Sequence, residues 1–169
     1  KQYASVDSII HCAGSSLVGP SIKNPSQYYE NNFIATKRML DHLCQYGYHP
    51  KVVFSSSAAV YGNPIALPIS EEDPKLPISP YGISKHMVEQ LLETYSEAYG
   101  LNYVGLRYFN AAGADPEGRH GQEKSATHII ARVMEAIKEQ KQFTLNGVGL
   151  ATEDGTCVRD YVHVADIAK

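Results

Sequence analysis

Tyr81 and Lys85 stand four residues apart, directly after Pro80. This spacing places both side chains on one face of a helix, one turn apart. A phenol is a poor base at neutral pH because its pKa is near ~10, and a nearby ammonium lowers that pKa by favouring the phenolate. The pair is therefore suited to moving a proton in an alcohol–ketone reaction. Ser55 and Ser57 end a predicted strand upstream, at a separation that suits one shared active site.

Apolar runs that alternate with amphipathic helical periods must position these residues. The expected strands are residues 6–13, 51–57, 102–110, 143–145 and 158–164, and the expected helices are residues 25–46, 80–99 and 126–140. Five prolines within residues 62–80 predict a long ordered surface loop, and residues 111–124 predict another loop. We expect the first strand to be buried around Ile9 and Ile10. The pattern predicts an α/β fold with a Rossmann-like, doubly wound parallel sheet.

The reactive pair falls on the apolar side of its helix. Tyr81, Lys85, Val88 and Leu92 follow one another by steps of four, three and four residues, which makes one ridge. Parallel sheets bind ligands at the carboxyl ends of their strands, where Ser55 to Ser57 are predicted to lie. The two segments are therefore expected to meet in one site rather than on the solvent surface.

Composition excludes several classes of protein. The chain has 169 residues, 43% of them hydrophobic, and a net charge of −3, which fits one globular domain and lacks the basic footprint of a nucleic-acid binder. No apolar run is long enough to span a membrane, and residues 1–12 do not resemble a signal peptide. Three widely spaced cysteines favour a reducing, cytoplasmic location. We expect no metal site, because His120 and His128 fit solvent, packing or substrate contacts better.

Six collinear runs carry a resemblance to a known family. They are His11-Cys12-Ala13-Gly14, Tyr28-Tyr29-Glu30-Asn31-Asn32, Ser55 to Gly62, Ser79 to Lys85, Leu106 to Asn110 and Asp154 to Val164. In this order, and over nearly the whole chain, they resemble the extended short-chain dehydrogenase/reductases, and within them the epimerases that act on UDP-sugars. No glycine-rich dinucleotide fingerprint occurs in the chain. We therefore interpret residues 1–169 as a partial NAD-binding Rossmann domain that lacks its first βαβ unit and a later substrate segment, with residues 111–157 contributing to the substrate-binding region. We expect these residues alone to bind NAD poorly and to be inactive.

The resemblance implies a reaction that interconverts UDP-glucose and UDP-galactose through a 4-keto intermediate, with transient hydride transfer to bound NAD. Tyr81 would take the proton from the sugar 4-hydroxyl, Lys85 would lower the pKa of Tyr81, and Ser57 would hydrogen-bond the reacting oxygen. A homodimer that pairs through the helices at 25–46 and 80–99 is also implied.

The resemblance also assigns binding residues. For the cofactor these are Cys12, Ala13, Gly14, Ser15, Ser16, Asn31, Ser55, Tyr81, Lys85 and Phe109; for the substrate they are Ser57, Tyr81, Asn110, His128 and Arg159. From the residues alone, Arg159 is equally suited to a diphosphate and to an ion pair with Asp160 or Asp166.

Two alternatives remain open at this point. The first is another epimerase of the family, acting on UDP-glucuronate or a UDP-N-acetylhexosamine. The second is a non-catalytic nucleotide-binding relative, which the retention of Tyr81, Lys85 and Ser57 disfavours. A dehydratase is disfavoured because Ala58 and Ala59 stand where that reaction requires acids.

Overall fold

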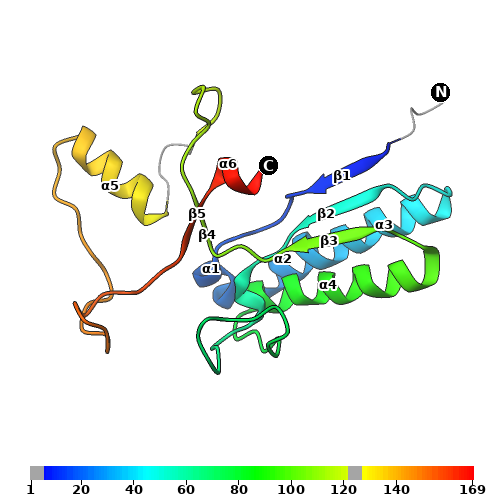
Figure 1. The fold of residues 1–169 in the computed structure, drawn as a ribbon, viewed down its shortest axis with the longest axis horizontal. Coiled ribbons are helices and arrows are strands. Elements are labelled where there is room, and N and C mark those ends of the chain that lie inside the picture. Colours follow the sequence, from blue (N-terminus) through cyan, green and yellow to red (C-terminus); the bar gives the residue numbers. More distant parts are fainter. Residues whose placement is uncertain (1–5, 122–126) are drawn as a thin grey trace. The chain divides into compact units, whose positions relative to one another are not determined.

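The computed structural model describes residues 6–121 and 127–169, which belong to two compact units. The first unit ends at Tyr108 and the second begins at Phe109. Strands and helices alternate along the chain and every strand pairing is parallel, which confirms the expected α/β class (Figure 1).

A three-stranded parallel sheet organises the first unit. Its strands β1 (Ser8–His11), β2 (Lys51–Ser55) and β3 (Tyr103–Leu106) lie in the order β1-β2-β3. The helical elements of this unit are α1 (Val18–Lys23), α2 (Pro25–Tyr28), a π-helical segment (Tyr29–Ile34), α3 (Ala35–Gln45), a 3₁₀ turn (Ala58–Val60) and α4 (Pro80–Tyr99). The carboxyl end of β2 is therefore followed directly by Ser56 and Ser57.

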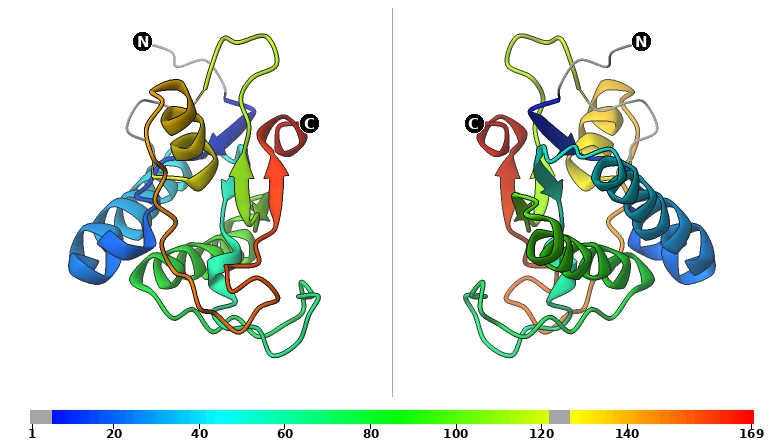
Figure 2. Two further views of the ribbon diagram at one scale, coloured as in Figure 1. Left: turned by 90° about the vertical axis from the view of Figure 1, so that its left-hand side faces the viewer. Right: turned by 90° about the vertical axis from the view of Figure 1, so that its right-hand side faces the viewer.

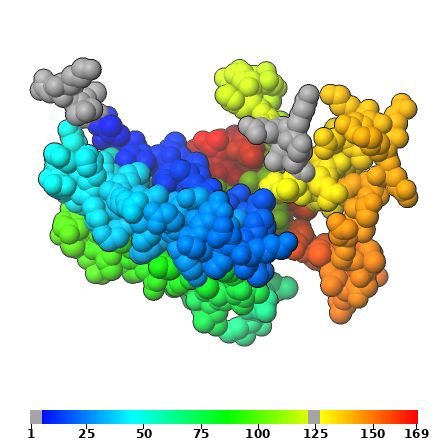
Figure 3. Space-filling view, turned by 180° about the vertical axis from the view of Figure 1, so that it is seen from behind, coloured from blue at the N-terminus to red at the C-terminus, as the bar shows by residue number. Residues whose placement is uncertain are grey.

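Helices α3 and α4 lie side by side along one face of this sheet (Figures 1 and 2). The buried core between them and the sheet consists of Leu40, Val52, Phe54, Val88, Leu92 and Leu101. Because successive strand residues point to opposite faces, Val52 and Phe54 enter this core while Val53 points away from it. Figure 3 shows α3 and α4 next to each other from behind.

The opposite face of the sheet carries an apolar row. Ile10 pairs with Val53, and Val53 pairs with Val104. Ile10 is 75% exposed and Val104 is 47% exposed. The prediction that Ile10 is buried was therefore wrong for the described residues, because α3 and α4 cover only the face that Val52 and Phe54 occupy.

Local signals fix both ends of α4. Ser79 Oγ accepts a hydrogen bond from the Gly82 amide at 3.1 Å, and Pro80 takes the first helical position, where its missing N–H costs nothing. Gly100 ends the helix in a left-handed conformation with φ of 70°. The predicted bounds of this helix are confirmed. The helix predicted over 25–46 is present, but the π-helical segment in its middle and the separate helix α1 before it were not predicted.

The second unit has its own small sheet. β4 (Asn110–Ala112) pairs in parallel with β5 (Tyr161–His163), and the helices are α5 (Ile129–Lys138) and α6 (Val164–Ile167). The prediction of a single strand over residues 102–110 was wrong. β3 ends at Leu106, where the Arg107 side chain donates to Glu89. The next strand, β4, begins at Asn110 and belongs to the other sheet. Residues 143–145 form no strand, and residues 122–126, within the predicted loop and the predicted helix start, lie outside the described residues.

Among the described residues, no helix combines the length and the apolar character needed to cross a bilayer. Within the same residues, no group of histidine, cysteine or acidic side chains is arranged to hold a metal ion.

Candidate active site

Tyr81, Lys85 and Ser57 gather where the end of β2 meets the start of α4. Lys85 is 5% exposed, and its Nζ donates a hydrogen bond to the Ser55 carbonyl at 2.7 Å. The same ammonium lies 6.0 Å from the centre of the Tyr81 ring. Ser57 Oγ accepts from the Ala59 amide at 3.2 Å, which caps the 3₁₀ turn and fixes the hydroxyl beside Tyr81. The expected meeting of the serine run with the tyrosine–lysine pair is present.

Burial governs the ionisation of Lys85. Removal of the ammonium from water lowers the pKa of Lys85 to about 8, and the nearby Cys12 opposes this effect. The Lys85 Nζ also lies 4.9 Å from the centre of the Phe54 ring, which supplies a cation–π contact in place of water.

Burial also governs Tyr81, in the opposite direction to the one predicted. Desolvation raises the pKa of Tyr81, and the Ser57 hydroxyl lowers it by a smaller amount. Lys85 does not offset this rise, because its ammonium is directed to the Ser55 carbonyl rather than to the phenol oxygen. In this arrangement the expected lowering of the Tyr81 pKa by Lys85 is therefore absent.

The loop after β1 holds five of the predicted cofactor residues. Cys12, Ala13, Gly14 and Ser16 are exposed, and Ser15 is half-buried. Asn31, also exposed, donates to Ser15 Oγ at 3.1 Å. Gly14 has φ of 144°, and a Cβ there would lie 2.8 Å from Asn32 Oδ1, so the backbone path of this loop requires glycine.

Asn32 holds this loop against α4, and the sequence analysis did not assign it a role. Its Oδ1 accepts from the Ser15 amide at 2.7 Å, and its Nδ2 donates to the Ser15 carbonyl at 3.0 Å and to Ser84 Oγ at 2.9 Å. Ser84 Oγ in turn donates to the Tyr81 carbonyl at 2.7 Å. One buried amide thereby links the loop to the first turn of α4.

A signal for Asn32 was present in the sequence. Tyr28, Asn32, Thr36 and Leu40 recur every four residues, and all four are buried. Two polar residues inside an otherwise apolar helical stripe indicate a buried hydrogen-bonding role, because a polar group buried without a partner is costly.

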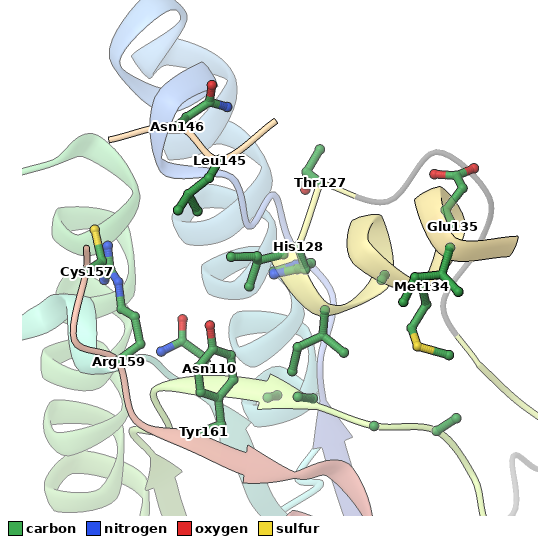
Figure 4. A pocket seen from close by; sticks show the side chains of 18 of the residues that line it. Asn110, Thr127, His128, Met134, Glu135, Leu145, Asn146, Cys157, Arg159 and Tyr161 are labelled. Atoms are coloured by element: carbon green, nitrogen blue, oxygen red, sulfur yellow. The ribbon is translucent and has the colours of Figure 1, made fainter. Parts of the chain in front are cut away.

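Three predicted substrate residues meet in the second unit. Asn110, His128 and Arg159 line one open cavity of about 1410 Å³ (Figure 4). Asn110 Nδ2 donates to the Asp160 carbonyl at 2.7 Å, which ties β4 to the segment that carries Arg159. Phe109, predicted to contact the cofactor, belongs to the same unit and is 44% exposed. Arg159 forms no ion pair with Asp160 or Asp166 among the described residues.

The cavity also includes residues that the sequence analysis did not assign. They are polar or sulfur-containing side chains such as Tyr161, Thr156 and Cys157, and apolar side chains of α5 such as Ile130 and Met134. The apolar period of residues 129–137 indicated a buried helix face; in the described unit part of that face lines the cavity instead.

Comparison with known proteins places this geometry in a family. The family model described as "NAD dependent epimerase/dehydratase family" matches residues 1–169. A UDP-glucose 4-epimerase of Halalkalibacterium halodurans is 49% identical over 97% of this chain.

Solved structures agree with that match. The UDP-glucose 4-epimerase from Brucella ovis in complex with NAD is 44% identical, with a TM-score of 0.89 over 96% of this chain. The enzyme from Bifidobacterium longum in complex with NAD⁺ and UDP is 40% identical, with a TM-score of 0.87 over 98% of this chain.

The chain spans about half the length of these relatives: 49% of the H. halodurans protein and 50% of each of the two solved chains. The match nevertheless extends over the whole of this sequence, residues 1–169. The chain, with its Rossmann-like arrangement of parallel strands and helices, belongs to the NAD dependent epimerase/dehydratase family.

Proposed function

We propose that the protein takes part in the interconversion of UDP-glucose and UDP-galactose as an NAD-dependent 4-epimerase. The observation that carries this proposal is the convergence of Tyr81, Lys85 and Ser57 at the end of β2 in a chain of this family. A proton acceptor, a cation and a neutral hydroxyl donor are what a reversible alcohol–ketone conversion requires.

Each of the three residues has a separate task in the proposed reaction. Tyr81 accepts the proton of the sugar 4-hydroxyl as the alcohol is oxidised, and returns it when the 4-keto sugar is reduced. Because Ser57 Oγ accepts from the Ala59 amide, its hydroxyl hydrogen can be donated to the reacting oxygen. Lys85 supplies positive charge beside the phenol, which stabilises the phenolate in the reaction complex. Burial raises the pKa of Tyr81 in this structure. The proposed stabilisation of the phenolate by Lys85 therefore applies to the site with cofactor and substrate bound.

The residues around Lys85 fit a dinucleotide. The chemistry that NAD supplies when bound is acceptance of hydride from sugar C4 and its return to the opposite face of the keto sugar. Cys12 to Ser16 are five successive small residues at the carboxyl end of β1, and all of them except the half-buried Ser15 are exposed, which leaves room for a ribose and phosphates. We propose that these residues, together with Asn31, Ser55, Lys85 and Phe109, hold the cofactor.

We propose that the cavity of the second unit binds the UDP part of the substrate. Arg159 offers a planar guanidinium that matches phosphate oxygens, and it lines the cavity together with Asn110 and His128. The cavity thus combines two cations, Arg159 and Lys138, with neutral donors, apolar surface and the carboxylates of Glu135 and Glu139. Residues 111–157 contribute most of this lining, in keeping with a substrate-binding region.

We further propose that the protein forms a homodimer through α3 and α4. The outer sides of these helices present a hollow of about 340 Å³ lined by Asp41, Cys44, Gln45, Tyr95 and Tyr99. Tyr95 Oη donates to Asp41 across the two helices, and Tyr99 is 52% exposed. A second copy would bury this aromatic surface.

The cysteines of the described residues are all free, which supports a reducing cytoplasmic location.

The deciding experiment is an assay of the complete gene product on UDP-galactose without added NAD, beside a Tyr81→Phe variant. We expect conversion to UDP-glucose in the parent and a loss of kcat of about 10²–10⁴-fold in the variant, because the phenol is the proton acceptor. Assays with UDP-N-acetylgalactosamine and UDP-glucuronate run in parallel. Activity only with one of these would assign a different UDP-sugar, and absence of both activity and bound NAD would support a binding protein without catalysis.

A further inference from the structure

Helix α4 contacts two successive residues at the end of β2 through two side chains one turn apart. Lys85 Nζ donates to the Ser55 carbonyl at 2.7 Å, and Glu89 Oε1 accepts from Ser56 Oγ at 2.5 Å. Tyr81, Lys85 and Glu89 are spaced by four residues, so the helix face that carries the proton acceptor continues to Glu89. The strand end that presents Ser57 is therefore held at two points by this face.

Arg107 completes the second of these contacts. Its Nε donates to Glu89 Oε1 at 2.9 Å and its Nη2 donates to Glu89 Oε2 at 2.8 Å, a bidentate ion pair. Its Nη1 donates to Tyr61 Oη at 2.8 Å, directly after the 3₁₀ turn that Ser57 caps. Arg107 thus joins the end of β3, helix α4 and the turn beyond Ser57.

The network is largely enclosed, with the Arg107 side chain 25% exposed at its edge. Ser56 is 0% exposed, Tyr61 is 5% exposed and Glu89 is 8% exposed. Burying a charged pair costs desolvation that apolar residues of similar volume would avoid, so such a pair adds little stability for its cost. What a bidentate pair provides is a fixed geometry, because both donor–acceptor lines must be satisfied at once.

Since the network contacts neither Tyr81 nor the Ser57 hydroxyl, its effect on a reaction must be indirect. The Ser55 carbonyl sets where the Lys85 ammonium sits, and the backbone at Ser56 sets where Ser57 points. A shift of the strand end would therefore move the cation and the hydroxyl donor together.

We propose that Glu89 and Arg107 are positioning residues for the epimerase reaction, and that they act by fixing the backbone of Ser55 to Ser57 against α4. The inference rests on the proposed function, because it assigns these two residues to the proton-transfer site of that reaction. A misplacement of about 1 Å at a reacting centre can lower a rate by about 10²-fold.

The test uses the complete gene product with three variants. Glu89→Gln keeps the size of the side chain and an acceptor for Ser56 but removes the charge that Arg107 requires. Ser56→Ala removes only the contact between β2 and Glu89. Arg38→Gln is the control, because its pair with Glu30 lies on the surface, with side chains 71% and 55% exposed.

For Glu89→Gln we expect kcat for UDP-galactose to fall by about 10- to 100-fold, with KM changed less than about twofold, because no residue of the network lines the proposed nucleotide cavity. The apparent pKa of the acid limb of the kcat profile should rise, since a displaced ammonium favours the Tyr81 phenolate less. Ser56→Ala should show a smaller fall in kcat and a smaller rise in the apparent pKa. Arg38→Gln should show neither change.

An unchanged kcat and pH profile in folded Glu89→Gln would overturn the inference, as would a fall in kcat with no change in the pH profile. If Glu89→Gln does not fold, Ser56→Ala decides in the same way. If the parent protein converts no UDP-sugar, the proposed function fails. The assignment of Glu89 and Arg107 to that reaction then fails with it, whereas an active parent protein with an unchanged kcat in Glu89→Gln overturns the positioning inference alone.

Discussion

At the scale of single residues, burial decides the behaviour of the reactive pair. Lys85 and Tyr81 are both driven toward their neutral forms by desolvation, which lowers the pKa of the ammonium and raises that of the phenol. Because its pKa is about 8, Lys85 is still mainly an ammonium at neutral pH, beside a neutral Tyr81 phenol. Formation of the phenolate is therefore expected to depend on what occupies the site.

This burial predicts a pH-dependent stability that belongs to Lys85. Its folded pKa of about 8 lies below the unfolded value near ~10.4, so the unfolded chain binds more protons between these two values. The free energy of unfolding should therefore rise with pH from about 8 to about 10.5, by about 3 kcal/mol in total from this group. The measurement is urea unfolding of the wild type and Lys85→Met at several pH values. Across this pH range the free energy of unfolding of the wild type should rise relative to that of Lys85→Met. A difference between the two proteins that stays constant with pH would contradict the prediction.

Individual residue types predicted part of the site and not the rest. Tyr81, Lys85 and Ser57 were found because each type has a distinctive chemistry and a short-range pattern. Glu89 and Arg107 were not, because their pairing joins residues 18 positions apart and is created only when α4 packs against the sheet. A glutamate four residues after a candidate lysine, next to the ridge predicted to be buried, was a signal for this pairing.

At the scale of elements, local capping signals carried the most reliable predictions. The bounds of α4 followed from Ser79, Pro80 and Gly100, whose effects act within one helical turn. The π-helical segment Tyr29–Ile34 has no such signal, and its presence was not predicted. The division of residues 102–110 between two sheets depends on long-range pairing with β5, which periodicity does not reveal.

The long loop of residues 62–80 is attached to the 3₁₀ turn through Gly62. Gly62 has φ of 66°, and a Cβ there would lie 2.0 Å from the Leu76 carbonyl oxygen. Gly100 has nearly the same backbone conformation, with φ of 70°, but nothing lies within 4 Å of its Cβ position. The two glycines therefore share one backbone cost and differ in the space around them.

Alanine at each position should separate these two effects. Gly100→Ala is expected to lower the free energy of unfolding by about 1–2 kcal/mol, the cost of a left-handed residue with a Cβ. Gly62→Ala should cost about 1–3 kcal/mol more, because the Leu76 backbone must move. Urea unfolding of both variants under one set of conditions is the measurement. Equal losses would mean that the loop yields freely and is not held at Gly62.

At the scale of the whole molecule, two units supply different parts of the proposed reaction. The first holds the proton-transfer residues and the small-residue loop after β1, and the second holds the cavity lined by Asn110, His128 and Arg159. Changes within the first unit should therefore alter kcat, and changes in the cavity should alter KM for the UDP-sugar. Because of this separation, a fall in kcat without a change in KM for Glu89→Gln would indicate that Glu89 acts on the proton-transfer residues and not on the cavity.

The proposed homodimer gives the last prediction. Tyr99 is 52% exposed beside the hollow between α3 and α4, so a charge there would have to be desolvated on association. Tyr99→Glu should therefore shift the complete gene product from twice the chain mass to the chain mass in light scattering at micromolar concentration. Leu67→Glu is the matched control, because Leu67 is 79% exposed in the loop that precedes α4 and belongs to neither helix, and this variant should remain dimeric. A monomeric parent protein, or a dimer that both variants retain, would mean that α3 and α4 do not form the interface. Loss of the dimer in both variants would point instead to an interface that includes the loop.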